Sequence, residues 1–374
     1  PTRPPIPTLA LANDTGEADG ITSDGTVLVG GLVEGGTWEF SLDGGTTWQA
    51  GSGDRFVLAE GDYAAGEVLV RQSDADGVTS GTRTVGSVIV DTTAPEAPSV
   101  ALGNDTGTLD GITADGTMVI GGLEPGALWE VSLDGGVSWQ RGVGDRFILA
   151  EGDYIEGLVQ VRQIDRAGNV SAPVELGPVT VDLTAPQAPT LALDGLEAGI
   201  TNETLVTVGN LEAGARWEFS LDGGASWTVG TGTSFSLPEG TYGLDQVQVR
   251  QTDGAGNVSP ATALTPVVID VTPPAVPVIS LVADSAITND ATVSVEGLEE
   301  GARWEYSLNG GVSWVVGVGD SFELPEGRYA AGQILTRQID AAGNVGGVAS
   351  LGAVEIDITP PPTPLLTLID AGDD

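Results

Sequence analysis

The sequence predicts an all-β protein built from four tandem immunoglobulin-like β-sandwich domains that form an elongated rod. Three observations support this fold class: a strict internal repeat, short strands of alternating apolar and polar residues, and the 56 glycines and 22 prolines that supply turns between the strands. No segment has the period of a helix. The repeat is marked by Trp38, Trp129, Trp217 and Trp304, which are separated by 91, 88 and 87 residues, and by Asp91, Asp182, Asp270 and Asp357 at the same three spacings.

These spacings divide the chain into four units of roughly 90 residues, the size of one immunoglobulin-like sandwich. We expect repeats 1 to 4 at residues 4–94, 95–185, 186–273 and 274–360. Residues 361–374 resemble the opening proline-rich stretch and its Leu-x-Leu strand. They therefore predict the start of a truncated fifth repeat and a longer parent protein.

Each repeat is expected to hold about seven strands, named A, B, C, C′, E, F and G in chain order. Strands C and C′ of repeat 1 flank Asp43-Gly44-Gly45, a turn whose residues tolerate the positive φ of a tight hairpin. The same turn recurs in repeats 2 and 3, and as Asn309-Gly310-Gly311 in repeat 4. The strands of repeat 1 are expected at residues 8–11, 26–32, 38–42, 46–49, 55–58, 68–72 and 87–90.

Strands C and F carry a charged pair at fixed positions. When Trp38 faces the core, Glu39 faces outward on strand C, and Arg71 faces outward on the neighbouring strand F. We expect a cross-strand ion pair worth about 0.2–1 kcal/mol, without a catalytic role. The four pairs are Glu39–Arg71, Glu130–Arg162, Glu218–Arg250 and Glu305–Arg337.

Two tryptophans in each repeat have different expected places. The first one, on strand C, matches the core tryptophan of this fold. The second one follows the hairpin and has two interpretations: an exposed platform on which a sugar stacks, or another aromatic that covers the core or a sheet edge. The second tryptophans are Trp48, Trp139, Trp227 and Trp314.

The composition excludes several function classes. The chain has 53 acidic and 13 basic residues, a formal net charge of −40 and a pI near 4.1. Such a polyanion is not a partner for nucleic acid or anionic lipid unless cations neutralise it, and we expect no membrane insertion by this segment. Because cysteine, histidine and lysine are absent, disulfides, imidazole or thiolate metal sites, Ser-His-Asp triads and Schiff bases are excluded. Carboxylates are the catalytic groups that remain, and nothing in the sequence marks a catalytic cleft. We therefore expect that the protein is not an enzyme.

Topology gathers acidic loops at the ends of the repeats. The BC and FG loops lie at the pole of a repeat that faces the preceding linker, whereas the AB loop lies at the opposite pole. Each junction should therefore collect an AB loop, a linker, and the BC and FG loops of the next repeat. Calcium prefers six to eight oxygen ligands of this kind, whereas zinc prefers the absent nitrogen and sulfur ligands.

We therefore expect calcium at the junctions, although single Asp and Asn residues are also ordinary turn formers and an acidic surface also suits salt adaptation. The AB loop of repeat 3 is short and offers mainly Asp194, and that of repeat 4 offers Asp284, so the number of ions should differ between junctions. The predicted ligands are Asp14, Asp19, Asp91, Glu124, Asp165, Asn169, Asp105, Asp110, Asp182, Asp253, Asn257, Asp270, Asp340, Asn344 and Asp357.

Three motifs carry a resemblance to a known family. They are the run Trp217-Glu218-Phe219-Ser220-Leu221-Asp222-Gly223-Gly224-Ala225-Ser226-Trp227, the run Leu237-Pro238-Glu239-Gly240-Thr241-Tyr242, and the run Val249-Arg250-Gln251-Thr252-Asp253-Gly254-Ala255-Gly256-Asn257, followed by the linker Asp-x-Thr-x-Pro. The chain resembles the bacterial immunoglobulin-like extender repeats of large biofilm-associated and RTX-type adhesins. The resemblance implies an extracellular, cell-surface protein exported by type I secretion, with junctional calcium that stiffens the rod; the motif residues map onto the linker aspartates and the FG-loop Asp and Asn.

The expected function is a structural extender that holds terminal adhesive domains away from the cell for surface attachment and biofilm formation. Four repeats should span on the order of 100–150 Å. The expected partners are calcium ions and neighbouring repeats, with any cell-surface or glycan ligand bound elsewhere in the parent protein. The alternative is that the repeats themselves bind a glycan, a host receptor or another copy of the adhesin.

Overall fold

The computed structural model describes residues 2–282 and 286–366. Asp284 and the end of the Leu-x-Leu segment, in 367–374, lie outside the described residues. Contacts group the chain into two compact units: Pro1–Ala185 with Asp253–Asn257, and Pro186–Thr252 with Val258–Asp374. The described residues contain no helix of a length and hydropathy that would allow it to cross a lipid bilayer.

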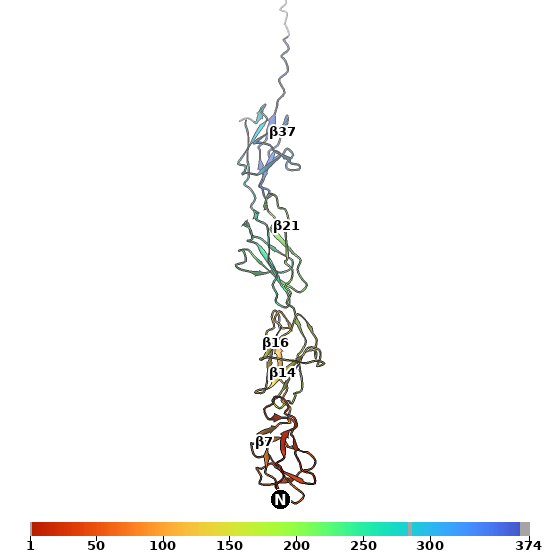
Figure 1. Cartoon of the computed structure of the whole chain (residues 1–374). Coiled ribbons are helices and arrows are strands. Elements are labelled where there is room, and N and C mark those ends of the chain that lie inside the picture. The colour runs from red at the N-terminus through yellow and green to blue at the C-terminus, as the bar shows by residue number, and fades with distance from the viewer. Residues whose placement is uncertain (1, 283–285, 367–374) are drawn as a thin grey trace, which may run out of the picture. The chain divides into compact units, whose positions relative to one another are not determined.

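The first unit holds the strands of repeats 1 and 2, coloured red to yellow-green in Figure 1. Repeat 1 contains β1 (Thr8–Leu11), β2 (Ile21–Thr22), β3 (Thr26–Gly30), β4 (Thr37–Ser41), β5 (Gln49–Ala50), β6 (Arg55–Val57), β7 (Gly61–Tyr63), β8 (Leu69–Ser73), β9 (Arg83–Thr84) and β10 (Val88–Val90). Repeat 2 contains β11 (Ser99–Leu102), β12 (Ile112–Thr113), β13 (Thr117–Gly121), β14 (Leu128–Ser132), β15 (Gln140–Arg141), β16 (Arg146–Ile148), β17 (Gly152–Tyr154), β18 (Gln160–Ile164), β19 (Val174–Glu175) and β20 (Val179–Val181).

The second unit holds the strands of repeats 3 and 4. Repeat 3 contains β21 (Thr190–Leu193), β22 (Ile200–Thr201), β23 (Leu205–Gly209), β24 (Arg216–Ser220), β25 (Thr228–Val229), β26 (Ser234–Ser236), β27 (Gly240–Tyr242), β28 (Gln248–Thr252), β29 (Thr262–Ala263) and β30 (Val267–Ile269). Repeat 4 contains β31 (Val278–Leu281), β32 (Ile287–Thr288), β33 (Thr292–Glu296), β34 (Arg303–Ser307), β35 (Val315–Val316), β36 (Ser321–Glu323), β37 (Gly327–Tyr329), β38 (Leu335–Ile339), β39 (Ala349–Ser350) and β40 (Val354–Ile356).

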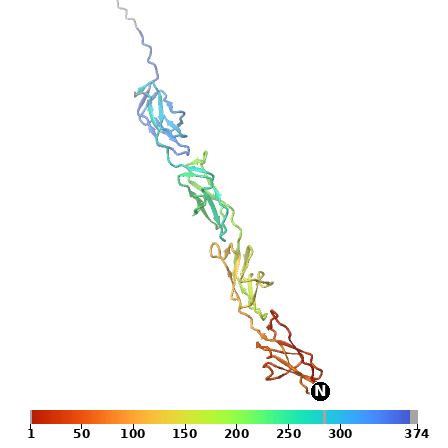
Figure 2. The same ribbon diagram turned by 60° about the vertical axis from the view of Figure 1, so that its left-hand side comes forward.

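The same sheet topology occurs in every repeat. In repeat 1, one sheet has the order β1-β3-β6, a second β5-β4-β8-β9, and a third β2-β10-β7. All pairings are antiparallel except that of β2 with β10, which is parallel. Figure 2 shows the strands of each repeat from a second side. The chain is therefore all-β, with tandem immunoglobulin-like sandwiches as the sequence predicted.

The structure has more strands than the seven expected in each repeat. The three additional strands of repeat 1 are β2, β7 and β9, which have only two or three residues and therefore show no alternation in the sequence. Strand G, expected at residues 87–90, pairs with β2 and β7 rather than with strand F. The short β9 takes the place beside β8, so the last segment of each repeat is divided between two sheets.

The core of each repeat is built around its first tryptophan, as predicted. Trp38 is buried together with Val27, Val70 and Val90, and its ring packs at a tilt against Phe56, with centroids 6.1 Å apart. The equivalent tryptophans, Trp129, Trp217 and Trp304, are buried in the cores of the other three repeats. Burying a side chain of this size supplies a large share of the hydrophobic stabilisation of so small a domain.

One core position in repeat 4 is suboptimal and gives a first prediction. Thr336 is completely buried, and its hydroxyl has no hydrogen-bond partner, whereas repeats 1 to 3 have valine there. Because an unsatisfied buried hydroxyl is costly, Thr336→Val should raise the free energy of unfolding of repeat 4 by about 1–2 kcal/mol. Urea unfolding followed by peptide-resolved hydrogen exchange would measure this. The reverse change, Val161→Thr, should destabilise repeat 2; a neutral result for both would contradict the prediction.

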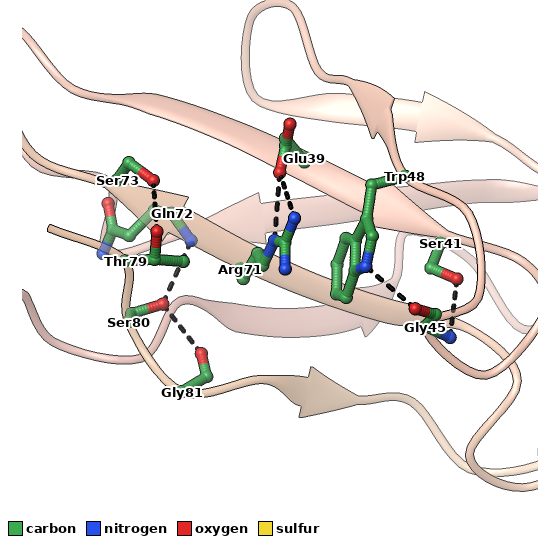
Figure 3. A network of polar contacts seen from close by, with 10 residues as sticks. All are labelled: Glu39, Ser41, Gly45, Trp48, Arg71, Gln72, Ser73, Thr79, Ser80 and Gly81. Atoms are coloured by element: carbon green, nitrogen blue, oxygen red, sulfur yellow. Dashed lines mark hydrogen bonds and ion pairs between the residues drawn. The ribbon is translucent and has the colours of Figure 1, made fainter. Parts of the chain in front are cut away.

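The predicted cross-strand ion pair is confirmed in all four repeats. Glu39 and Arg71 lie directly opposite each other on β4 and β8, and Nε and Nη2 of Arg71 donate to the same carboxylate oxygen at 3.0 and 2.8 Å (Figure 3). The guanidinium also stacks over the second tryptophan, Trp48, 3.8 Å from the ring centroid. The other three repeats have the same stack.

This stack bears on the two interpretations of the second tryptophan. One face of the Trp48 ring is covered by Arg71, and Nε1 of the indole donates to the carbonyl of Gly45. The ring is half-buried rather than fully exposed. Its contacts are those of an aromatic that covers a sheet surface, with a cation–π interaction worth about 0.5–1 kcal/mol.

The hairpin aspartates give a prediction on acid stability. The hydroxyl of Ser138, its backbone N–H and the hydroxyl of Ser132 donate to Asp134, and they lower the pKa of that carboxyl to about 2. Hydrogen bonds donated by the hydroxyls of Thr47 and Ser226 likewise lower the pKa values of Asp43 and Asp222 to about 2. Because the folded pKa lies below the unfolded value of about 3.8, this stabilisation is complete above pH ~4 and is lost as the pH falls through ~2.

Repeat 4 provides a natural control for this prediction, since Asn309 makes the same turn without a charge. The triple variant Asp43→Asn, Asp134→Asn, Asp222→Asn should have a lower urea midpoint than the parent at pH 7, because its neutral side chains lack the charge-assisted hydrogen bonds. It should lose less stability than the parent between pH 4 and pH 2. Parallel losses in the two proteins, monitored by tryptophan fluorescence, would contradict the assignment.

Candidate inter-repeat junctions

Each linker is held by the repeat that precedes it. The linker after repeat 1 begins at Asp91, whose Oδ1 accepts the N–H of Thr93 at 3.0 Å. The hydroxyls of Thr92 and Thr93 donate to Glu60, and the first of these hydrogen bonds is the main reason that the pKa of Glu60 is lowered. The other repeats use the pairs Thr184–Glu151, Thr272–Glu239 and Thr359–Glu326.

This role of Glu60 was not predicted from the sequence, although a signal for it was present. The glutamate stands in the recurring Pro-Glu-Gly or Ala-Glu-Gly segment, at a fixed spacing from the linker threonine. A polar residue at such a constant distance from a linker indicates a hydrogen bond that ties the linker to the repeat before it. These hydrogen bonds fix the start of each linker.

The FG loop, between β8 and β9 or their equivalents, contacts the linker that precedes its own repeat. At the first junction, Nδ2 of Asn169 donates to the carbonyl of Asp91 at 2.7 Å and to the carboxylate of Asp165 at 2.9 Å. The backbone N–H of Asn169 donates to the other carboxylate oxygen at 2.8 Å. The predicted ligands Asp165 and Asn169 are thus brought together with Asp91, and their hydrogen bonds close the loop.

The AB loop, between β1 and β3, contacts the FG loop of the next repeat. The hydroxyl of Thr15 and the N–H of Ser23 both donate to the carbonyl of Ala167. Arg166 donates to Asp19 at 2.6 Å, which is the main cause of the lowered pKa of Asp19. The predicted meeting of the AB loop, the linker and the FG loop at one junction is therefore found in the first unit.

Three predicted ligands line one cavity at this junction. Asp91, Glu124 and Asp165 surround a cavity of about 220 Å³, with Arg166 and the apolar residues Ile21 and Ile89 on its walls. Across the described ranges 2–282 and 286–366, however, no three acidic side chains come close enough to hold a metal ion. The arrangement brings oxygen ligands to one place without assembling a complete coordination shell.

A second position at the same loops fits a cation better. Oδ2 of Asp14 accepts the N–H of Gly20 at 3.0 Å, but its Oδ1 is buried and has no donor. Asp105 in repeat 2 has the same bond, to Gly111, and the same buried oxygen without a partner. A buried carboxylate oxygen without a donor is energetically costly, and calcium takes carboxylate oxygens of this kind as ligands. These two loops fit the expected ion.

The remaining predicted ligands occupy equivalent places, most of them with hydrogen bonds. Asp110 accepts from Thr108 and Ile112, and the carbonyl of Asp182 accepts from Asn257, which also bonds Asp253. In the second unit, Asn344 bonds both Asp340 and the carbonyl of Asp270. Asp357 accepts the N–H of Thr359. The three asparagines thus share one observed role, which is to join the FG loop to the preceding linker.

Comparison with known proteins shows remote similarity to solved β-domain structures. No family model matches the chain, and no curated protein matches it. Fibronectin(III)-like modules of Clostridium thermocellum CbhA have a TM-score of 0.30 and 15% identity, over 47% of this chain and 94% of theirs. Domains FN1–FN3 of chicken CNTN1 have 0.30 and 12%, over 72% and 99%.

A 1.5-MDa bacterial ice-binding adhesin, studied for host cell surface retention, has a TM-score of 0.24 and 16% identity, over 71% of this chain and 99% of that chain. Identities and TM-scores of this size add nothing to the fold that the strand pairing already establishes.

Proposed function

We propose that this chain is an extender segment of a bacterial surface adhesin and that calcium stiffens its inter-repeat junctions. The observation that carries the proposal is the first junction, where the AB loop, the linker and the FG loop of the next repeat contact one another through Thr15, Asp91, Ala167 and Asn169. Serial domains that contact only their neighbours are suited to adding length. The extracellular location, type I secretion, RTX character and role in biofilm formation are supported by the sequence resemblance.

Calcium would bind the AB loops of repeats 1 and 2 through Asp14 and Asp105. It would supply positive charge at a buried carboxylate oxygen that has no donor. The chain's own residues prepare the site, since the N–H groups of Gly20 and Gly111 orient the two carboxylates. Neutralising these loops would also reduce repulsion within a chain of net charge −40.

Small-angle scattering of the fragment in calcium and in excess chelator, at fixed ionic strength, tests this function. We expect chelation to shorten the average end-to-end distance and to lower the thermal unfolding midpoint. The double variant Asp14→Asn, Asp105→Asn should behave in calcium like the parent in chelator. The control Asp54→Asn, Asp145→Asn removes the same charge from exposed positions and should retain the calcium response. Identical scattering of the parent in calcium and chelator would contradict the proposal.

A further inference from the structure

We propose that the junctions are of two kinds: the junction between repeats 1 and 2 is locked, whereas the junction between repeats 3 and 4 is a compliant joint. The inference builds on the proposed extender function, but it concerns this chain's own backbone contacts. It follows from a comparison of the AB loop of repeat 1 with that of repeat 3.

The lock of the first junction is a backbone-to-backbone contact. A Cβ atom on Gly16 would lie 2.2 Å from the carbonyl oxygen of Arg166, and one on Gly168 would lie 3.0 Å from the nitrogen of Gly16. Only glycine permits the two loops to approach this closely. The hydroxyl of Thr15 holds the contact through the buried Ala167 carbonyl.

The AB loop of repeat 2 has the same features. Thr106 donates to the carbonyl of Ala255, and a Cβ atom on Gly107 would lie 2.2 Å from the carbonyl oxygen of Gly254. The contact therefore depends on the Asp-Thr-Gly segment that these two loops share, at Asp14 and at Asp105. The same contact is therefore found in two separate AB loops.

The AB loop of repeat 3 lacks that segment and closes on itself. The stretch between β21 and β22, residues 194–199, is three residues shorter than residues 12–20 of repeat 1. Glu197 and Ile200 exchange two backbone hydrogen bonds around Ala198 and Gly199, whose φ values of 52° and 84° are those of a tight hairpin turn. In the long AB loops of repeats 1 and 2, polar groups form hydrogen bonds with the FG loop of the next repeat. In the short AB loop of repeat 3, the backbone polar groups of Glu197 and Ile200 bond each other instead.

The FG loop of repeat 4, on the other side of the third junction, keeps the residues that such a contact needs. Repeat 4 retains the Ala-Gly pair at Ala342 and Gly343, and Asn344 still donates to the linker carbonyl of Asp270 at 2.7 Å. The closest approach of the repeat 3 loop region to Gly343 is Nδ2 of Asn202, 3.7 Å from where a Cβ would stand. Between the AB segment 194–204 and the FG loop of repeat 4, both wholly described, no hydrogen bond is found. The hydrogen bond of Asn344 to the linker is therefore present at this junction, but the backbone contact between the AB and FG loops is not.

A junction that is held through its linker alone restricts translation of the next repeat but leaves that repeat free to pivot, because few contacts oppose local opening. Two loops in backbone contact, fixed by a buried carbonyl, oppose pivoting as well. A stalk in which a compliant joint follows locked junctions can reorient the part beyond that joint without losing the length of the rest.

Paired spin labels test the inference directly, since the chain has no cysteine of its own. Val57→Cys with Ile148→Cys spans the first junction, and Ser236→Cys with Glu323→Cys spans the third. All four are exposed and equivalent positions on β6, β16, β26 and β36. Pulsed electron–electron distance measurements should give a distribution at least about twofold broader across the third junction than across the first.

Two variants test the assigned cause. Gly16→Val should broaden the first distribution towards that of the third. Replacing residues 194–199 by residues 103–111 of repeat 2 should narrow the third, because its partners Ala342 and Gly343 are already present. The control Gly86→Val, at a glycine with open space around it, should leave the first distribution unchanged.

Equal widths across the two junctions in the parent protein would overturn the inference, as would a graft that folds but leaves the third distribution broad. Repeating the measurements in chelator separates this inference from the calcium proposal. If calcium has no effect on either junction but the widths still differ, the calcium proposal fails and the two kinds of junction stand. If chelator broadens the first distribution but the two distributions are equally wide in calcium, the inference fails and the calcium proposal stands.

Discussion

Gln163→Leu should lower the free energy of unfolding of repeat 2 by about 3 kcal/mol or more. Gln163 is completely buried on β18. Its Oε1 accepts the N–H of Glu124 at 2.9 Å, and its Nε2 donates to the carbonyls of Glu96 at 2.6 Å and Gly122 at 3.2 Å. Leucine would leave one N–H and two carbonyls without their partners, and each such buried group costs about 1–3 kcal/mol.

The change should be measured for repeat 2 alone, because a chain of four repeats need not unfold in one cooperative step. Urea unfolding with peptide-resolved hydrogen exchange gives a midpoint for each repeat. The matched control is Gln140→Leu, at an exposed position on β15 of the same repeat, which should shift the midpoint little. Equal shifts for the two variants would show that Gln163 does not organise the segment before β11 and the BC loop.

The effect should extend to the junction, because Glu124, which Gln163 holds through its backbone, lines the cavity that Asp91 and Asp165 share. The same arrangement occurs in every repeat, where Gln72, Gln251 and Gln338 are equally buried and bonded. A polar side chain thus fixes the loops on which the proposed function depends.

Features that depend on short-range periodicity could be predicted from the sequence. The burial of Trp38, the outward position of Glu39 and its pairing with Arg71 all follow from the two-residue period of strands C and F. The meeting of the AB loop, linker and FG loop followed from strand direction alone. The same periodicity also places Gln72 on the inner face with Val70, a signal that we did not use.

Features that depend on three-dimensional contact could not be predicted. The donation of Asn169 to a linker carbonyl requires a geometry that spans 78 residues of sequence. The orphaned oxygen of Asp14 is defined only by what surrounds it. Whether an acidic residue is a ligand, a turn former or a tether depends on its neighbours in space, and the calcium ligands therefore stay predictions.

Gly142→Val is the second change for which we expect a large effect, a loss of about 3 kcal/mol in the stability of repeat 2. A Cβ atom at Gly142 would lie 2.1 Å from Cζ2 and 2.2 Å from Cε2 of the Trp129 indole. Overpacking a rigid core ring costs about 1–3 kcal/mol, and valine adds two methyl groups beyond the Cβ. The same ring donates from Nε1 to the carbonyl of Gly144 at 2.7 Å, so it cannot move aside without losing that bond.

Because the φ of Gly142 is not positive, the clash with the ring, and not backbone strain, should cause the loss. Gly177→Val, at an exposed glycine with open space and an ordinary φ, is the control and should have little effect. A double-mutant cycle isolates the contact: in a Trp129→Phe background the smaller ring leaves room, so Gly142→Val should cost clearly less there than in the parent. If the cost is the same in both backgrounds, the glycine is required for a reason other than the tryptophan.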